Sequence, residues 1–157
     1  VVTVQLVCDS AKSFLGRLRP YFLAICDPDW SRINCTDSHT GRAVFVTNYT
    51  CRGDAYLVKR ARLSFPSGHA AFTVFTMTFL ILYLERRFRW CGPIFLRFGL
   101  QLACGLVAWL TCLTRLTDYK HHVEDLIAGA LIGAGFALAV RMCASGMICY
   151  PGDAMAD

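Results

Sequence analysis

The chain has 157 residues, of which 55% are hydrophobic and only 17% are charged, and its formal net charge is +5. This length suits one domain with a sizeable core and excludes two ordinary domains, and so apolar a composition favours membrane helices over a soluble protein. Net positive charge by itself suits nucleic acid, anionic headgroups and phosphorylated substrates equally, but the sequence carries no RNA- or DNA-binding motif.

The chain opens on an apolar stretch that reaches Asp9 without a signal-peptide pattern, and we expect this stretch to finish a helix that starts earlier. Residues 13–65 follow as a long polar and basic segment. Turn signals at 27–29 and 52–54 interrupt this segment, and one β-like run covers 43–49. We therefore expect residues 13–65 to form a large extramembrane loop.

Cysteines and glycosylation sequons gather in this loop. Cys26, Cys35 and Cys51 lie beside two sequons, whose acceptors are Asn34 and Asn48. The combination is typical of an oxidising lumenal or extracellular compartment. Because three is an odd number, one thiol stays free or pairs elsewhere, and the sequence leaves the pairing open.

Three apolar stretches come next, and we expect helical membrane spans at 66–84, 93–113 and 122–142. The uncharged runs 70–84 and 126–140 are shorter than the roughly 20 residues that cross a hydrocarbon core, so the buried helices of a soluble all-α protein would also fit. Polar residues at the membrane interface can complete each run, and the composition favours an all-α, multi-span membrane protein.

The third span contains Gly129 and Gly133, a GxxxG pattern that predicts close packing on a sister helix.

Two features of the sequence disagree about the side of the membrane on which the loop lies. A simple count of Lys and Arg places the 13–65 loop in the cytosol, because it carries more of them than the turn at 86–89. That rule weights short loops, and a phosphate site needs cations for chemical reasons, so the sequons favour the lumen or the exterior.

Three clusters of reactive side chains fall at helix ends on one predicted side of the membrane. The first contains Lys12 and Arg19, which are about two helical turns apart and can share one helix face, and Pro20 ends any helix there. A solvated basic face beside a membrane would explain this cluster equally well. It therefore predicts a phosphate site only together with the other two.

The second cluster is Pro66-Ser67-Gly68-His69, directly before an apolar helix. Ser67 can cap that helix, Gly68 lets the backbone approach a ligand, and free N–H groups at the helix start attract an anion. His69 would then exchange a proton beside a bound anion near neutral pH.

The third cluster combines Arg115 with His121 and, four residues later, Asp125. At a helix start this spacing brings the carboxylate near the imidazole, where it would fix the tautomer and leave the other ring nitrogen free to attack. A metal site within residues 121–125 is the competing interpretation. Adjacent histidines point about 100° apart on a helix and no HExxH spacing is present, so we expect no metal.

In this order and spacing, the three clusters resemble the signature of the type-2 phosphatidic acid phosphatase superfamily, most closely its animal lipid phosphate phosphatases. The resemblance runs from Lys12 to about Arg141. The segments that carry it are Lys12-x6-Arg19-Pro20, Cys26-Asp27-Pro28-Asp29-Trp30, Ile33-Asn34-Cys35, Pro66-Ser67-Gly68-His69, Thr114-Arg115, and Asp118-Tyr119-Lys120-His121-His122 with Asp125.

The resemblance implies a helical fold and metal-free, cofactor-free hydrolysis of lipid phosphomonoesters such as phosphatidate, lysophosphatidate, ceramide phosphate and sphingosine phosphate. It implies that His121 attacks and becomes a phosphohistidine, that Asp125 orients it, and that His69 protonates the leaving alkoxide. The partners it implies are a phosphorylated lipid and the bilayer of the plasma membrane or an endomembrane, and homo-oligomerisation stays open. The residues implied to bind the phosphoryl group are Lys12, Arg19, Ser67, Gly68 and Arg115.

Two departures from the family pattern stand out. Thr114 replaces the usual Ser, which keeps the hydroxyl, and the animal relatives have six spans, so residues 1–157 are expected to be one partial catalytic domain. Two other functions stay open. The chain would be a phosphatase of the same superfamily acting on another phosphate ester or a diphosphate, or a non-catalytic relative that binds lipid or a partner.

Overall fold

A computed structural model describes residues 1–36, 40–44, 46–47, 49–87 and 94–147. Every regular element of these residues is helical, in agreement with the all-α fold class. The elements are α1 (Val2–Leu15), α2 (Phe22–Cys26), the 3₁₀ helix η1 (Trp30–Arg32), α3 (Ala55–Ala61), α4 (Gly68–Arg87), α5 (Ile94–Thr117) and α6 (Val123–Met147).

The β-like run at 43–49 forms no strand in its described residues, so that expectation is wrong for them. Its one ladder contact is an isolated bridge between Thr36 and Ala43. Two short paired segments are at best marginally stable without a third strand or a covering helix. A local pattern of strand-forming residues is therefore not sufficient to form a strand here. Phe45 and Asn48 lie outside the described residues.

Within the described ranges, three helices are long and apolar enough to cross a membrane: Gly68–Arg86, Ile94–Thr117 and Val123–Ala144. They begin one or two residues after the expected spans and end two to four residues beyond them, because helical hydrogen bonding continues through the polar residues at their C-terminal ends. α5 has the most outward-facing apolar surface, with Phe95 and Trp109 90% and 63% exposed. Such a surface is expected of a helix that faces lipid.

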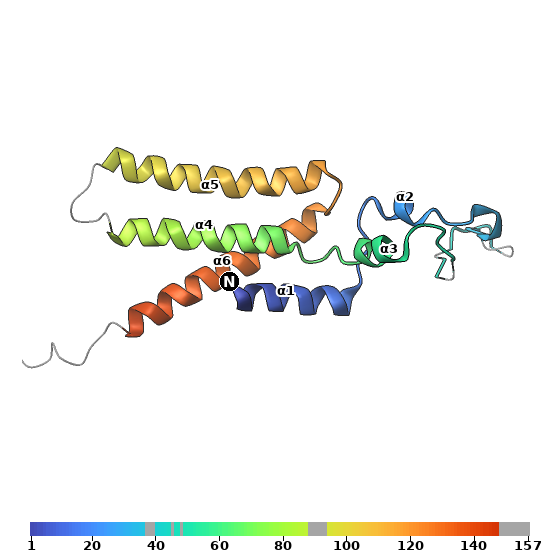
Figure 1. Cartoon of the computed structure of the whole chain (residues 1–157), viewed down its shortest axis with the longest axis horizontal. Helices are drawn as coiled ribbons and strands as arrows, with labels where there is room; N and C mark the ends of the chain where they lie inside the picture. The colour runs from blue at the N-terminus through green and yellow to red at the C-terminus, as the bar shows by residue number, and fades with distance from the viewer. Residues whose placement is uncertain (37–39, 45, 48, 88–93, 148–157) are drawn as a thin grey trace, which may run out of the picture.

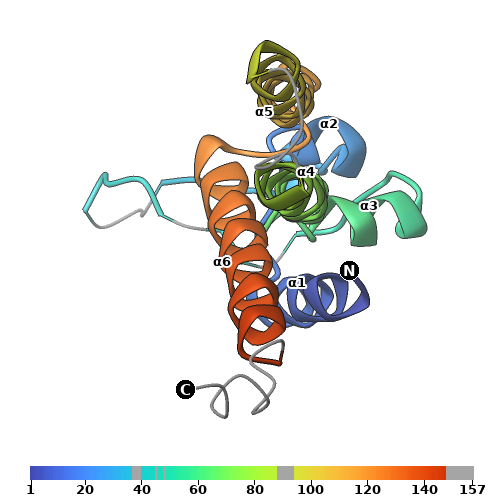
Figure 2. The same cartoon turned by 90° about the vertical axis from the view of Figure 1, so that its left-hand side faces the viewer.

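Helix α4 lies between α5 and α6 and packs against both (Figures 1 and 2). The contact with α6 is close at the GxxxG pattern. A Cβ added at Gly129 would lie 2.4 Å from the Ser67 carbonyl oxygen, and one at Gly133 would lie 2.3 Å from that of Ala71. The predicted packing of this pattern on a sister helix is therefore confirmed, and the backbones approach closely because neither glycine has a side chain.

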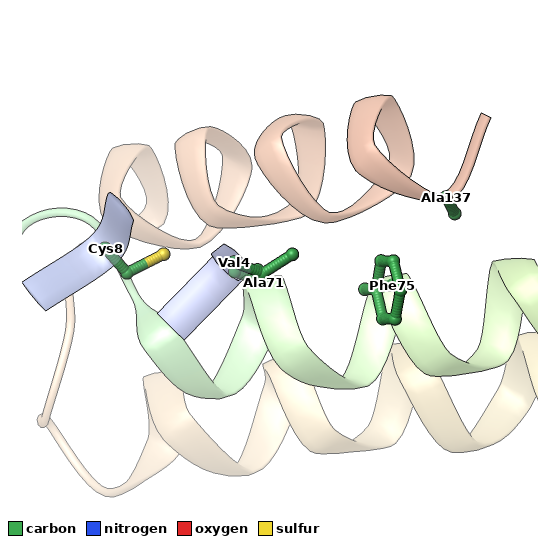
Figure 3. Close-up of a cluster of buried hydrophobic side chains, with 5 residues drawn as sticks. All are labelled: Val4, Cys8, Ala71, Phe75 and Ala137. Atoms are coloured by element: carbon green, nitrogen blue, oxygen red, sulfur yellow. The ribbon is translucent and has the colours of Figure 1, made fainter. Parts of the chain in front are cut away.

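Helix α1 packs against α4 and α6 and completes the core between the long helices. Val4 and Cys8 of α1 meet Ala71 and Phe75 of α4 and Ala137 of α6 (Figure 3). The helix does not end near Asp9 but continues to Leu15, because the Asp9 carboxylate is satisfied within the helix by Gln5 and Lys12.

The extramembrane segment has a small core of its own. Phe22 and Cys26 of α2 pack against Val58 and Ala61 of α3, and a disulfide joins Cys26 to Cys51. This pairing answers the question left by three loop cysteines, and it leaves Cys35 exposed with a free thiol.

The predicted functional clusters lie at one end of the bundle. The C-terminal ends of α1 and α5 and the N-terminal ends of α4 and α6 all lie at the end nearest α2 and α3 (Figure 1). Segments that are far apart in the sequence therefore meet there.

Candidate active site

The first turn of α4 is tied to the first turn of α6. The Ser67 backbone N–H donates to the Asp125 carbonyl at 2.9 Å, and the Ser67 hydroxyl accepts from the Ala70 N–H at 3.4 Å as a helix cap. Gly68 follows and has little room for a side chain, since a Cβ there would lie 3.0 Å from the Lys12 Nζ. The ammonium group of Lys12 thus sits against the start of α4.

Lys12 and Arg19 do not share a helix face, so that expectation is wrong. Helix α1 ends at Leu15, and Gly16 adopts the left-handed conformation with a φ of 56°, which turns the chain. Arg19 is held separately: its backbone N–H donates to the Ala61 carbonyl at 2.8 Å and its Nη1 donates to the Tyr21 hydroxyl at 2.9 Å.

His121 is almost fully buried and is held by a main-chain carbonyl. Its Nδ1 lies 2.8 Å from the Ser64 carbonyl oxygen but 3.8 Å from the nearer Asp125 oxygen, too far for a hydrogen bond. The carboxylate therefore lies near the ring, as expected, but no hydrogen bond joins the two. Because a carbonyl only accepts, Nδ1 carries the proton and Nε2 keeps a free lone pair.

The buried carboxylate of Asp125 links the three clusters. Its Oδ2 accepts from the Ser64 hydroxyl at 2.5 Å and from the His122 N–H at 3.0 Å, and its Oδ1 accepts from Arg17 at 2.9 Å. It thus joins the segments before α4 and α6 to the one after α1. Asp125 makes no hydrogen bond to His121, but it supports the ring through Ser64 and acts on it electrostatically from 3.8 Å.

A pocket of about 310 Å³ opens in front of His121, and none of its described lining residues is acidic. The Nε atoms of Arg19 and Arg115 are buried and have no hydrogen-bond partner within the described part of the chain. Two such donors fit an anionic ligand with several oxygens, because a buried unpaired N–H is costly. The lining residues are Arg19, Tyr21, Ile25, Leu57, Arg60, His69, Arg115, Lys120 and His121.

Burial and charge keep the His121 imidazole neutral. Burial lowers the pKa of His121 to about 4, with help from the nearby Arg19 cation and against the opposing effects of the Ser64 carbonyl and Asp125. Above that pKa the ring is unprotonated at Nε2, the form that can attack phosphorus.

The other expected site residues divide between the pocket and its surroundings. His69 and Arg115 line the pocket, and Arg115, Lys12, Arg19 and Lys120 all lie close enough to His69 to act on it electrostatically. Ser67 and Gly68 are buried beside the pocket at the start of α4. Within the described residues no cluster of three His, Cys, Asp or Glu side chains could hold a metal ion.

The sequence reasoning missed Ser64, Arg17 and Arg60. Arg17 had a signal, because it stands two residues before Arg19 in a basic motif, and its ion pairs with Asp125 and Glu124 are 2.9 and 2.6 Å long. Ser64 had no signal in the sequence. It holds His121 through its main-chain carbonyl, a group that every residue has. The loop acceptors stand apart from the site, since Asn34 is exposed and Asn48 lies outside the described residues.

The long apolar helices of the bundle are those of a membrane protein. The cationic, histidine-containing pocket at one end of the bundle is suited to bind a phosphoryl group. The chain belongs to the PAP2 superfamily, the type-2 phosphatidic acid phosphatases, whose family profile matches residues 1–146.

Curated relatives agree with this membership. The chain is 43% identical to phospholipid phosphatase 1 of Mus musculus over 90% of its own length and 48% of that protein. It is 42% identical to phospholipid phosphatase 2 of Homo sapiens over 95% of its own length and 47% of that protein. The chain thus spans less than half the length of these relatives. No solved structure matches it significantly.

Proposed function

We propose that the protein hydrolyses phosphomonoesters of lipids, including phosphatidate, lysophosphatidate, ceramide phosphate and sphingosine phosphate, through a phosphohistidine and without a metal. The observation that carries the proposal is the neutral His121 ring, whose Nδ1 is bonded to Ser64 and whose other nitrogen is free beside a pocket lined by His69 and two arginines with unpaired donors. The names of the relatives, phospholipid phosphatases, support the lipid substrate class.

The first chemical step forms the phosphoenzyme. The Nε2 lone pair of His121 attacks phosphorus, and the bond between phosphorus and the lipid oxygen breaks. His69, which also lines the pocket, donates a proton to the departing alkoxide. The Ser64 carbonyl favours this step because it stabilises the positive ring that forms when His121 is phosphorylated.

Fixed cations replace the metal ions of other phosphoryl-transfer sites. Arg19 and Arg115 offer their unpaired Nε donors, and Lys12 stands against Gly68, whose N–H at the start of α4 bonds to no carbonyl of the described residues. The Ser67 N–H is already bonded to Asp125, so Ser67 would contribute only its hydroxyl. Charge that develops on the phosphoryl oxygens is thus met by donors already in place.

The second step returns the enzyme to its starting state. Water attacks the phosphohistidine, the bond between phosphorus and Nε2 breaks, and inorganic phosphate leaves. His69, deprotonated by the first step, accepts the proton from that water. Asp125 has a positioning role in both steps, because it holds Ser64 and thereby the carbonyl that orients His121.

The site faces the lumen or the exterior in this proposal. The disulfide between Cys26 and Cys51 joins the end of α2 to the stretch before α3, the two helices that form one wall of the pocket, and such bonds persist in oxidising compartments. The exposed Asn34 sequon lies on the segment that the disulfide closes. The protein would act as an integral membrane protein of the plasma membrane or an endomembrane.

Rapid-quench trapping of radiolabelled phosphoenzyme, in excess EDTA and with full-length protein in detergent micelles, tests the proposal. Wild-type protein should give an acid-labile, base-stable label, and His121→Ala should abolish both label and turnover. His122→Ala is the matched control, since its ring contacts Asp125 and does not line the pocket, and it should keep the label. A label on His121→Ala, or activity lost in EDTA and regained with one divalent metal, contradicts the proposal.

A further inference from the structure

The pocket is built from two walls of different origin. Arg19, His69, Arg115 and His121 come from the motif-bearing helix ends, whereas Ile25, Leu57 and Arg60 come from α2 and α3. The volume of about 310 Å³ equals roughly ten water molecules at about 30 Å³ each, more than one phosphoryl group fills. The wall formed by α2 and α3 therefore borders space that one phosphoryl group would not fill.

Arg60 is the charged group of that wall. Its guanidinium lies over the Tyr56 ring, 5.7 Å from the centroid, and no ion pair among the described residues involves it. Lys120 and Arg115 of the pocket both pair with Asp118, at 3.0 and 3.5 Å, and Arg19 donates to the Tyr21 hydroxyl at 2.9 Å. Arg60 thus keeps its donors for a ligand.

Helix α3 holds Arg60 at a fixed place relative to the reactive groups. Asp54 caps the helix by accepting from the Leu57 N–H at 3.0 Å, and Val58 is buried against α2. The Ala61 carbonyl, one residue after Arg60, accepts from the Arg19 N–H at 2.8 Å. The distance between the Arg60 backbone and the phosphate-binding Arg19 is therefore set by the fold.

We propose that Arg60, flanked by the apolar Leu57 and Ile25, forms a specificity subsite for a hydrogen-bond-accepting oxygen close to the scissile phosphate ester. Two sources offer that chemistry: the ester carbonyl of a glycerol backbone, and the second phosphate of a diphosphate. An ammonium group near the phosphate is disfavoured there, because it meets a like charge. This inference rests on the proposed phosphatase function.

The test compares kcat/KM for four lipid substrates in detergent micelles, with purified full-length protein. Dodecyl phosphate has no acceptor beyond the ester oxygen, phosphatidate adds a carbonyl, dodecyl diphosphate adds a phosphate, and sphingosine phosphate adds an ammonium. In Arg60→Gln the preference for phosphatidate or for the diphosphate over dodecyl phosphate should fall about 10- to 100-fold, the loss expected for one charged hydrogen bond. In the same variant, the preference for sphingosine phosphate over dodecyl phosphate should rise.

Lys59→Gln is the matched control. It makes the same charge change one residue away on the same helix, but Lys59 does not line the pocket. The relative kcat/KM values of this variant for the four substrates should therefore match those of wild type. A fall confined to phosphatidate assigns the carbonyl as the bound oxygen, and a fall confined to the diphosphate assigns the second phosphate.

Three results overturn the inference. Unchanged preferences in Arg60→Gln mean that no such subsite exists, and an equal loss for all four substrates means that Arg60 binds the scissile phosphate itself. A loss in Lys59→Gln equal to that in Arg60→Gln means that general electrostatic attraction is responsible. Wild-type protein that hydrolyses none of the four would instead overturn the proposed function, and this inference with it.

Discussion

At the scale of single residues, the proposed chemistry depends on which form of the His121 ring is present at neutral pH. The ring is buried, its Nδ1 is held by the Ser64 carbonyl, and Arg19 lies nearby. All three features belong to the folded protein. A histidine in an unfolded chain would be half protonated near pH 6.5.

Histidine titration provides the first prediction. Because burial and Arg19 lower the pKa of His121 to about 4, the ring should stay neutral throughout the physiological range and gain its proton only as the pH falls toward 4. NMR of histidine-labelled protein in micelles, with His121→Asn to assign the signal, should give a midpoint well below 6.5. Phosphoenzyme formation should persist to pH 5. A midpoint at or above 6.5 would show that the ring is not shielded in this way.

Ser64 and Asp125 provide the second prediction. The Ser64 hydroxyl donates to Asp125 and its carbonyl holds His121, so the two residues should act as one unit. Ser64→Ala and Asp125→Asn should each lower kcat more than KM, and the double variant should lose little more than the worse single variant. Ser64→Thr, which keeps the hydroxyl, should recover part of the rate. Additive losses would mean that Asp125 acts on His121 independently of Ser64.

At the scale of elements, the site depends on how closely α6 approaches α4. Gly129 lies against the carbonyl of Ser67, the residue that caps α4 and bonds to Asp125. The same contact therefore packs the bundle and aligns the two helix starts that carry His69 and Asp125.

Replacement of this glycine provides the third prediction. Gly129→Ala places a Cβ 2.4 Å from the Ser67 oxygen and should destabilise the protein by about 1–3 kcal/mol and reduce activity. Gly135→Ala is the control: no heavy atom lies within 4 Å of its added Cβ, and alanine favours the helix. Melting temperatures in one detergent should fall for the first variant and stay or rise for the second. Equal melting temperatures would show that the two helices separate easily.

At the scale of the whole molecule, the proposed orientation rests on the segment closed by the Cys26–Cys51 disulfide rather than on the count of basic residues. We predict that Asn34 carries glycan when the full-length protein is made in a eukaryotic cell, because its side chain is exposed on that segment. Glycosidase digestion should increase gel mobility, and Asn34→Gln should remove that change or the share of it due to this site. Absence of any glycan, with cytosolic labelling of the free Cys35 thiol, would reverse the orientation.

The sequence by itself determined the family, the helical class and the principal chemical groups. Long apolar runs can satisfy their backbone in a membrane only as helices, and short motifs at their ends name His69, His121 and Arg115 directly. These features are local: a motif or a run of apolar residues can be read without knowing what lies beside it.

Only the tertiary structure decided which groups touch. The direct bond expected between Asp125 and His121 is replaced by bonds through Ser64, and Lys12 and Arg19 reach the site from separate segments because Gly16 turns the chain. No local pattern marks Arg60 as a pocket residue, since α3 is brought there by the small core around the disulfide. The physical reason is that hydrogen bonds and pocket walls join residues distant in sequence, and local spacing carries no information about those contacts.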